Sequence, residues 1–86
     1  MSAKRKKVIY FYTKNNCKLC EEAKQILEVF QRDYGFDIME QNIYHHEKLL
    51  EQYFLTIPVI RVNDQELTAE KLSFATVDEF LREQLT

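Results

Sequence analysis

The clearest indication of the fold is a short apolar run just ahead of an amphipathic helical pattern. Residues 8–12, with the sequence VIYFY, are all β-branched or aromatic and lie between lysines and a polar segment. Such a continuous run predicts a fully buried central strand. From Cys20 onward, apolar residues recur at intervals of three and four. This spacing predicts a helix over residues 18–34, ended by Gly35 as a C-cap.

Further strand and helix patterns follow this first unit. Residues 36–40 alternate imperfectly between apolar and polar, which predicts a second strand that is less buried than the first. A helical segment is predicted between residues 44 and 54, since its apolar residues fall on one face. These residues are Leu49, Leu50, Tyr53 and Phe54. We expect the segment to end at Ile57-Pro58, because proline cannot continue a helix.

The C-terminal third predicts a hairpin and a final helix. Residues 59–62 and 66–68 have strand patterns and are separated by the turn signal Asn63-Asp64. Thr76, with Glu79 three residues later, has the pattern of a capping box that starts the helix. The expected buried stripe of this helix comprises Val77, Phe80, Leu81 and Leu85.

The resulting element order is β-α-β-α-β-β-α, which is an α/β architecture. A helix joins the first two strands, so they must be parallel, whereas the last two strands form an antiparallel hairpin. We therefore expect a four-stranded mixed sheet flanked by helices. Because 86 residues are too few for two separate cores, residues 1–86 are predicted to form a single domain, with residues 1–6 as a basic N-terminal arm.

Charge and length exclude several classes of protein. The formal net charge of -2 creates no field that attracts a polyanion, so no nucleic-acid partner is expected. The basic run at residues 4–7 is interpreted as a solvated arm, and a nuclear or nucleic-acid tag is the alternative. Too few apolar residues follow it for a secretion signal or a spanning helix, so no membrane partner is expected. Two cysteines cannot build the disulfide framework of a small secreted domain, which favours a reducing, cytoplasmic location.

Cys17 and Cys20 form a CxxC pair where the first strand gives way to the first helix. The unpaired N–H groups of a helix's first turn carry partial positive charge, which favours a thiolate over a thiol. Cys17 is therefore the predicted nucleophile. Cys20, one helical turn away, is the predicted resolving cysteine, because the spacing lets a disulfide close across the turn.

Zinc binding is the alternative explanation for the CxxC pair, since half of a structural zinc site has the same spacing. Two more ligands would be needed, and the remaining candidates are the adjacent His45 and His46. Adjacent histidines lack the usual offset of three to five residues. We interpret them as exposed residues that open the second helix and predict no metal site.

The chain's only proline lies in the sequence Thr56-Ile57-Pro58-Val59, about 40 residues after the cysteine pair. Together with the strand, CxxC and helix start, this segment resembles the thioredoxin fold, and specifically the glutaredoxins. The resemblance covers residues 8–85. It implies that Pro58 is cis and faces the dithiol, and that Thr56, Ile57 and Pro58 bind substrate, with Ile57 offering its backbone groups. The alternative is a trans proline that only ends the second helix.

Lys14 adds to the resemblance, because it coincides with a glutaredoxin lysine that contacts glutathione; a solvated loop lysine is the alternative. Two features depart from the family pattern. Lys18-Leu19 stands between the cysteines in place of Pro-Tyr, and Thr68-Ala69-Glu70 stands in place of a glycine pair and an acidic residue. Side chains at the glycine positions are expected to crowd the approach of glutathione. The start of the helix instead resembles compact glutaredoxin-like proteins with a Cys-x-Leu-Cys-Glu-Glu-Ala sequence.

The sequence thus predicts a monomeric thiol-disulfide oxidoreductase that reduces or exchanges disulfides through Cys17 and Cys20. Its expected partners are a disulfide-containing protein or a small thiol, and an electron donor that the sequence does not identify. No cofactor is expected, with glutathione as a possible co-substrate. The alternative function is a non-catalytic thioredoxin-fold module that binds a partner next to the Pro58 loop.

Overall fold

A computed structural model of the protein describes residues 7–85. The elements follow the predicted order, with two short 3-10 helices added. They are β1 (Val8–Thr13), α1 (Lys18–Tyr34), β2 (Asp37–Asn42), the 3-10 helix η1 (Ile43–His45), α2 (Glu47–Tyr53), β3 (Val59–Val62), β4 (Gln65–Leu67), the 3-10 helix η2 (Ala69–Lys71) and α3 (Phe74–Leu85). The expectation of a basic arm at residues 1–6 lies outside the described residues.

The four strands form one mixed sheet in the order β2-β1-β3-β4. β1 pairs in parallel with β2, and β3 pairs antiparallel with both β1 and β4. The predicted fold class is thus confirmed. The hairpin turns where expected, at Asn63, whose φ of 54° is a left-handed conformation that asparagine tolerates.

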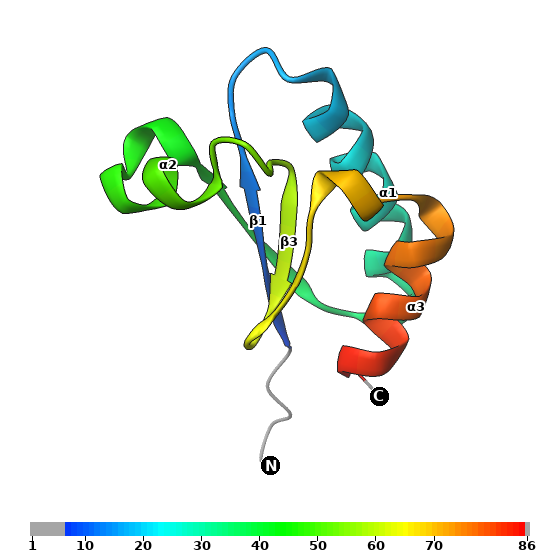
Figure 1. Cartoon of the computed structure of the whole chain (residues 1–86). Helices are drawn as coiled ribbons and strands as arrows, with labels where there is room; N and C mark the ends of the chain where they lie inside the picture. The colour runs from blue at the N-terminus through cyan, green and yellow to red at the C-terminus, as the bar shows by residue number, and fades with distance from the viewer. Residues whose placement is uncertain (1–6, 86) are drawn as a thin grey trace.

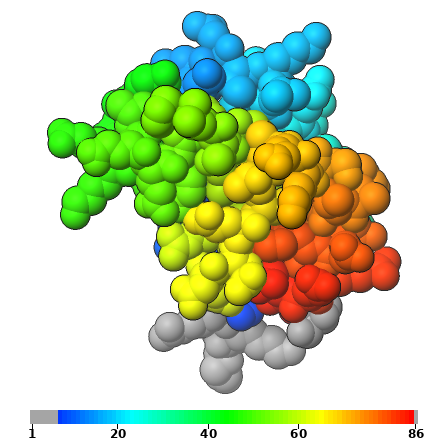
Figure 2. Space-filling model, in the orientation of Figure 1, coloured from blue at the N-terminus to red at the C-terminus, as the bar shows by residue number. Residues whose placement is uncertain are grey.

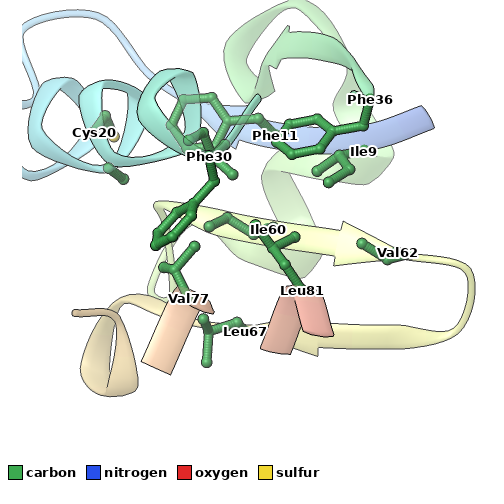
Figure 3. Packing of buried hydrophobic residues seen from close by; sticks show 12 residues of the cluster. Ile9, Phe11, Cys20, Phe30, Phe36, Ile60, Val62, Leu67, Val77 and Leu81 are labelled. Carbon is green, nitrogen blue, oxygen red and sulfur yellow. The ribbon is translucent and has the colours of Figure 1, made fainter. Parts of the chain in front are cut away.

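The helices lie on both faces of this sheet, with α1 and α3 on one side and α2 on the other (Figure 1). The larger core cluster lies between the sheet and the α1–α3 pair, and Figure 3 shows Phe11, Phe30 and Leu81 converging there from three elements. A smaller cluster under α2 comprises Tyr12, Ile43, Tyr53 and Val59. The neighbours Val59 and Ile60 belong to different clusters because successive strand residues point to opposite faces.

β1 is central in the sheet. Its composition predicted a fully buried strand, but two of its side chains remain partly exposed. Ile9 and Phe11 point toward α1 and α3 and are completely buried, whereas Val8 and Tyr10 remain 37% and 39% exposed. These two residues lie on the face that carries α2, and α2 is only seven residues long. It covers Tyr12 at the carboxyl end of β1 and leaves the beginning of that face open.

The predicted boundaries of α1 are confirmed. The helix ends at Gly35, which adopts the left-handed conformation (φ 67°, ψ 54°) and donates its N–H to the carbonyl of Gln31 at 2.9 Å. Glycine is the residue for which this conformation carries no Cβ penalty. The length of α1 thereby brings the chain back to begin β2 beside β1.

The segment predicted as one helix between residues 44 and 54 is divided in two. His46 adopts an extended conformation (φ -139°, ψ 108°), so η1 ends there and α2 begins at Glu47. Tyr53 is buried as expected. Phe54 was predicted to share its face, but it is the C-cap of α2 and is 54% exposed.

The predicted start of the last helix at Thr76 was wrong. α3 begins at Phe74, and Ser73 precedes it. The Thr76 N–H donates to Ser73 Oγ at 3.2 Å, while the Ser73 N–H donates to Thr76 Oγ1 at 2.8 Å. This reciprocal pair satisfies the helix start, so Glu79 has no capping role. Of the predicted stripe, Val77 and Leu81 are completely buried, and Phe80 and Leu85 pack beside them.

Candidate active site

Cys17 is placed at the N-terminus of α1 by a tight turn after β1. Asn16 takes a left-handed conformation (φ 54°), which asparagine tolerates better than most residues, and Cys17 follows in an extended one (φ -116°, ψ 106°). The Cys17 sulfur accepts a hydrogen bond from the backbone N–H of Cys20 at 3.2 Å. The sulfur thus occupies the position in which a serine or aspartate oxygen caps a helix.

The two cysteines of the pair differ in their access to solvent. Their sulfurs are joined as a disulfide across the first turn of α1, and their Cα atoms are 5.2 Å apart. Cys17 is half-buried, whereas Cys20 is only 3% exposed and belongs to the larger core cluster. An incoming thiol or disulfide can therefore reach Cys17 more readily than Cys20.

The segment before Pro58 is tied to its surroundings through its backbone. The Ile57–Pro58 peptide bond is cis. The N–H groups of Thr56 and Ile57 both donate to the Tyr53 carbonyl, at 2.9 Å and 3.1 Å, and the Thr56 carbonyl accepts the Ala69 N–H at 3.1 Å. No group within residues 7–85 donates a hydrogen bond to the Ile57 carbonyl. Of the two Ile57 backbone groups expected to face a substrate, only this carbonyl is available.

A small apolar hollow lies between the start of α1, the Pro58 segment and η2. Its volume is about 60 Å³. It is lined by Leu19, Glu22, Ala23, Ile26, Pro58, Ala69 and Leu72. In the space-filling view, the amber segment around residue 70 and the cyan part of α1 lie side by side (Figure 2). We refer to this site as the apolar hollow.

A second hollow, of about 150 Å³, is lined by both cysteines and is polar. Its lining comprises Thr13, Lys14, Asn16, Cys17, Cys20, Glu21, Lys24 and Glu40. Lys24 of α1 and Glu40 of β2 form an ion pair across it, with Nζ and Oε1 3.0 Å apart. The hydrogen bond to Glu40 and the attraction of its charge raise the pKa of Lys24 above its usual value. We refer to this site as the polar hollow.

With this geometry established, comparisons with known proteins identify the family. The family model described as "Glutaredoxin-like domain (DUF836)" matches residues 8–85, which is nearly the whole chain. The chain belongs to this glutaredoxin-like family. A protein from Nitrosomonas europaea, solved by NMR, resembles this glutaredoxin-like chain with a TM-score of 0.71 and 28% identity, over 93% of this chain and 96% of that one.

Solved thioredoxins share the fold of this glutaredoxin-like domain. The oxidised thioredoxin of Plasmodium falciparum is 13% identical with a TM-score of 0.71, over 92% of this chain and 81% of that one. Thioredoxin 1 of Thermosipho africanus is 14% identical with a TM-score of 0.56, over 88% of this chain and 96% of that one. The resemblance to the thioredoxin fold is thus confirmed, and the cysteine pair of the glutaredoxin-like domain is consistent with a redox function.

The glutaredoxin-like fold brings some of the candidate site residues together and separates others. Lys14 lines the polar hollow with both cysteines. Pro58 lines the apolar hollow, while Thr56 lines neither and is held by Tyr53 and Ala69. Ile57 is half-buried and packs against both core clusters. Cys17 is also half-buried and packs against the larger cluster. Of the candidate residues, Lys14 therefore shares a hollow with the cysteines, and Pro58 lines a different one.

Sequence reasoning missed several residues around the cysteines of the glutaredoxin-like domain. Leu19 is 60% exposed in the first turn of α1, and its apolar character on an open helix face between two cysteines could have drawn attention to it. Leu72 and the Lys24–Glu40 pair join the site only through tertiary contacts. No local pattern in the sequence signals them.

The histidines considered as zinc ligands lie apart from any ligand cluster. His45 ends η1 and His46 precedes α2, and both are exposed, as predicted. Across residues 7–85, no three potential metal-ligating side chains come together. The same part of the chain also contains no helix long and apolar enough to span a membrane.

Proposed function

We propose that the protein is a thiol-disulfide oxidoreductase in which Cys17 is the nucleophile and Cys20 is the resolving cysteine. The observation that carries this proposal is the position of the Cys17 sulfur, which is half-buried at the N-terminus of a 17-residue helix and accepts a backbone N–H. In the reduced protein, this hydrogen bond and the helix dipole favour the thiolate. The thiolate is the form of cysteine that attacks disulfides.

The proposed reaction transfers two electrons in two steps. The Cys17 thiolate attacks one sulfur of the substrate disulfide, breaks that bond and releases the other sulfur as a thiolate. Cys20 then loses its proton and attacks the Cys17 sulfur, which releases the second substrate thiol and leaves the Cys17–Cys20 disulfide. A thiol or dithiol donor must reverse this disulfide to complete a cycle.

Substrate contacts are proposed at the Pro58 segment and in the polar hollow. Ile57 offers its carbonyl, which accepts no hydrogen bond from any group in residues 7–85, and Pro58 supplies apolar surface. Thr56 acts by holding this segment through its bonds to Tyr53 and Ala69. Lys14 provides a positive charge in the polar hollow, where it favours thiolate and carboxylate groups of an incoming substrate.

The expected partners remain a disulfide-containing protein or a small thiol, and an electron donor of the thiol class. Glutathione is the less favoured partner. Ala69 stands where glutaredoxins have glycine, and it donates its N–H to the Thr56 carbonyl and lines the apolar hollow. We also propose that the protein acts as a monomer in the cytoplasm, without a cofactor.

The proposal is tested by single-turnover reduction of a chromogenic disulfide with the reduced protein. We expect Cys17→Ser to abolish the reaction, and Cys20→Ser to accumulate a mixed disulfide that mass spectrometry detects. Full activity of the Cys17→Ser variant would contradict the assignment. Leu55→Ser is a suitable control, since Leu55 is 82% exposed and lines neither hollow.

A binding module without turnover is the second candidate function. The apolar hollow favours it, because this surface does not depend on a reactive sulfur. Partner capture by a Cys17→Ser/Cys20→Ser double variant, at the affinity of the unmodified protein, would support this function. Loss of capture in the double variant would favour the redox function.

A further inference from the structure

We infer that the apolar hollow selects the substrate: it receives an aliphatic side chain next to the reactive cysteine of an extended protein segment, with a basic residue beyond it. This inference rests on the proposed redox function and names the substrate class for it. The substrate is then a protein disulfide, and not a small acidic thiol such as glutathione.

The size and lining of the hollow indicate an aliphatic side chain. A single water molecule needs about 10–15 Å³ of such space, so a hollow of about 60 Å³ has room for the few carbon atoms of an aliphatic side chain. Among its lining residues, Leu19 is exposed and Leu72 is half-buried, whereas Ala23 and Pro58 are buried. Leu19 is 60% exposed, so an apolar substrate side chain in the hollow would remove the surface of Leu19 from water.

The backbone beside Pro58 leaves a single hydrogen-bonding group for a substrate. The Ile57 carbonyl lies one residue before Pro58 and can accept an N–H from an extended chain. The Ile57 N–H is already bonded to Tyr53, so the pairing is limited to one hydrogen bond. With only one backbone contact, recognition depends more strongly on the side chain that enters the hollow.

The charge of the apolar hollow's lining indicates which residue of the substrate lies beyond the aliphatic side chain. Glu22 is the only charged residue that lines the apolar hollow, it is exposed, and it forms no ion pair with any residue between 7 and 85. Its carboxylate attracts a lysine or arginine of the partner. The same carboxylate repels the two carboxylates of glutathione.

The test uses peptide disulfides that differ only beside the cysteine. Each peptide carries a mixed disulfide with thionitrobenzoate, whose release is followed by absorbance. Cys17 attacks the peptide sulfur and expels thionitrobenzoate, and Cys20 then releases the peptide thiol. The peptides are Arg-Leu-Cys-Leu-Arg, Gln-Leu-Cys-Leu-Gln and Gln-Ser-Cys-Ser-Gln, with the glutathione mixed disulfide as a fourth substrate. Rates are divided by those measured with dithiothreitol, which removes differences in intrinsic reactivity.

We expect the leucine peptide to react about tenfold faster than the serine peptide, which is typical for apolar discrimination in a small pocket. Leu19→Ser should bring this ratio toward one, whereas Leu55→Ser should leave it unchanged. Glu22→Gln should remove the advantage of arginine over glutamine, and Glu28→Gln, farther along α1 and outside the hollow, should keep it. Ratios between substrates are insensitive to any change in the reduction potential of the variants.

Equal rates with the leucine and serine peptides would overturn the inference, as would a ratio that survives Leu19→Ser. Fastest reaction with the glutathione mixed disulfide would also overturn it. In each of these cases thionitrobenzoate is still released, so the redox function stands. If no substrate releases thionitrobenzoate, the proposed function itself fails.

Discussion

The backbone N–H of Cys20 points at the Cys17 sulfur across 3.2 Å, so one cysteine of the pair caps the helix turn that carries the other. This bond ties the chemistry to the fold, because a helix start that must be capped is also the place where a negative charge is stabilised. The Cys20 sulfur does not occupy such a capping position. It is 3% exposed and packs in the larger core cluster.

The first prediction concerns the reactivity of the two thiols in the reduced protein. We expect iodoacetamide at pH 7 to alkylate Cys17 at least about tenfold faster than free cysteine, since alkylation requires the thiolate. Cys20 should react more slowly than Cys17, because its side chain is buried. Peptide mapping by mass spectrometry measures both rates, and similar rates for the two cysteines would contradict the assignment of the nucleophile.

The second prediction tests the observed start of α3. Ser73→Ala removes the oxygen that accepts the Thr76 N–H and should lower the free energy of unfolding by about 1 kcal/mol. Glu79→Gln should change it by less than about 0.5 kcal/mol, as expected for an exposed side chain without a capping role. Urea denaturation measures both. The opposite order would restore the capping box that the sequence predicted.

The third prediction concerns Tyr53, the last residue of α2. Its hydroxyl donates a hydrogen bond to a Glu66 carboxylate oxygen, and its ring stacks on Tyr12 with centroids 4.6 Å apart. Burial, followed by the hydrogen bond to Glu66, raises the pKa of Tyr53 to about 12. The folded state therefore holds this proton more tightly than the unfolded state, whose pKa is near 10.

The stabilisation from this protonated hydroxyl is complete below about pH 10 and is lost as the pH rises toward 12. We expect Tyr53→Phe to lower the free energy of unfolding at pH 7 by about 1 kcal/mol, since it removes one hydrogen bond and keeps the ring. The variant should also lose less stability between pH 10 and 12 than the unmodified protein. Tyr44→Phe is the control, because Tyr44 is 58% exposed, and it should leave the free energy of unfolding at pH 7 unchanged.

The fourth prediction separates backbone conformation from packing at Gly35. A Cβ added to Gly35 would have no atom within 4 Å, so its cost comes only from the left-handed φ of 67°. Gly35→Ala should therefore lower the free energy of unfolding by about 1–2 kcal/mol. Gly35→Asn should cost less, because asparagine tolerates this conformation. Equal losses in the two variants would indicate a different cause.

Local sequence predicted those parts of the fold that depend on neighbouring residues. The boundaries of α1 follow from the spacing of its apolar residues and from Gly35, and both are confirmed. The hairpin was also predicted correctly, from the strand patterns on either side of Asn63. At the end of α2, however, the same spacing rule failed for Phe54, because spacing says which residues share a face and not whether another element covers that face.

The order of the elements and the position of Cys17 at a helix start follow from residues close together in the chain, and the helical connection between β1 and β2 makes their pairing parallel. Only the packing of the folded chain places Leu19 and Leu72 in one hollow, Glu40 beside Lys24, and the Ala69 N–H against the Thr56 carbonyl. These contacts depend on how helices and loops pack across the sheet. A one-dimensional pattern of apolar and polar residues does not specify that packing.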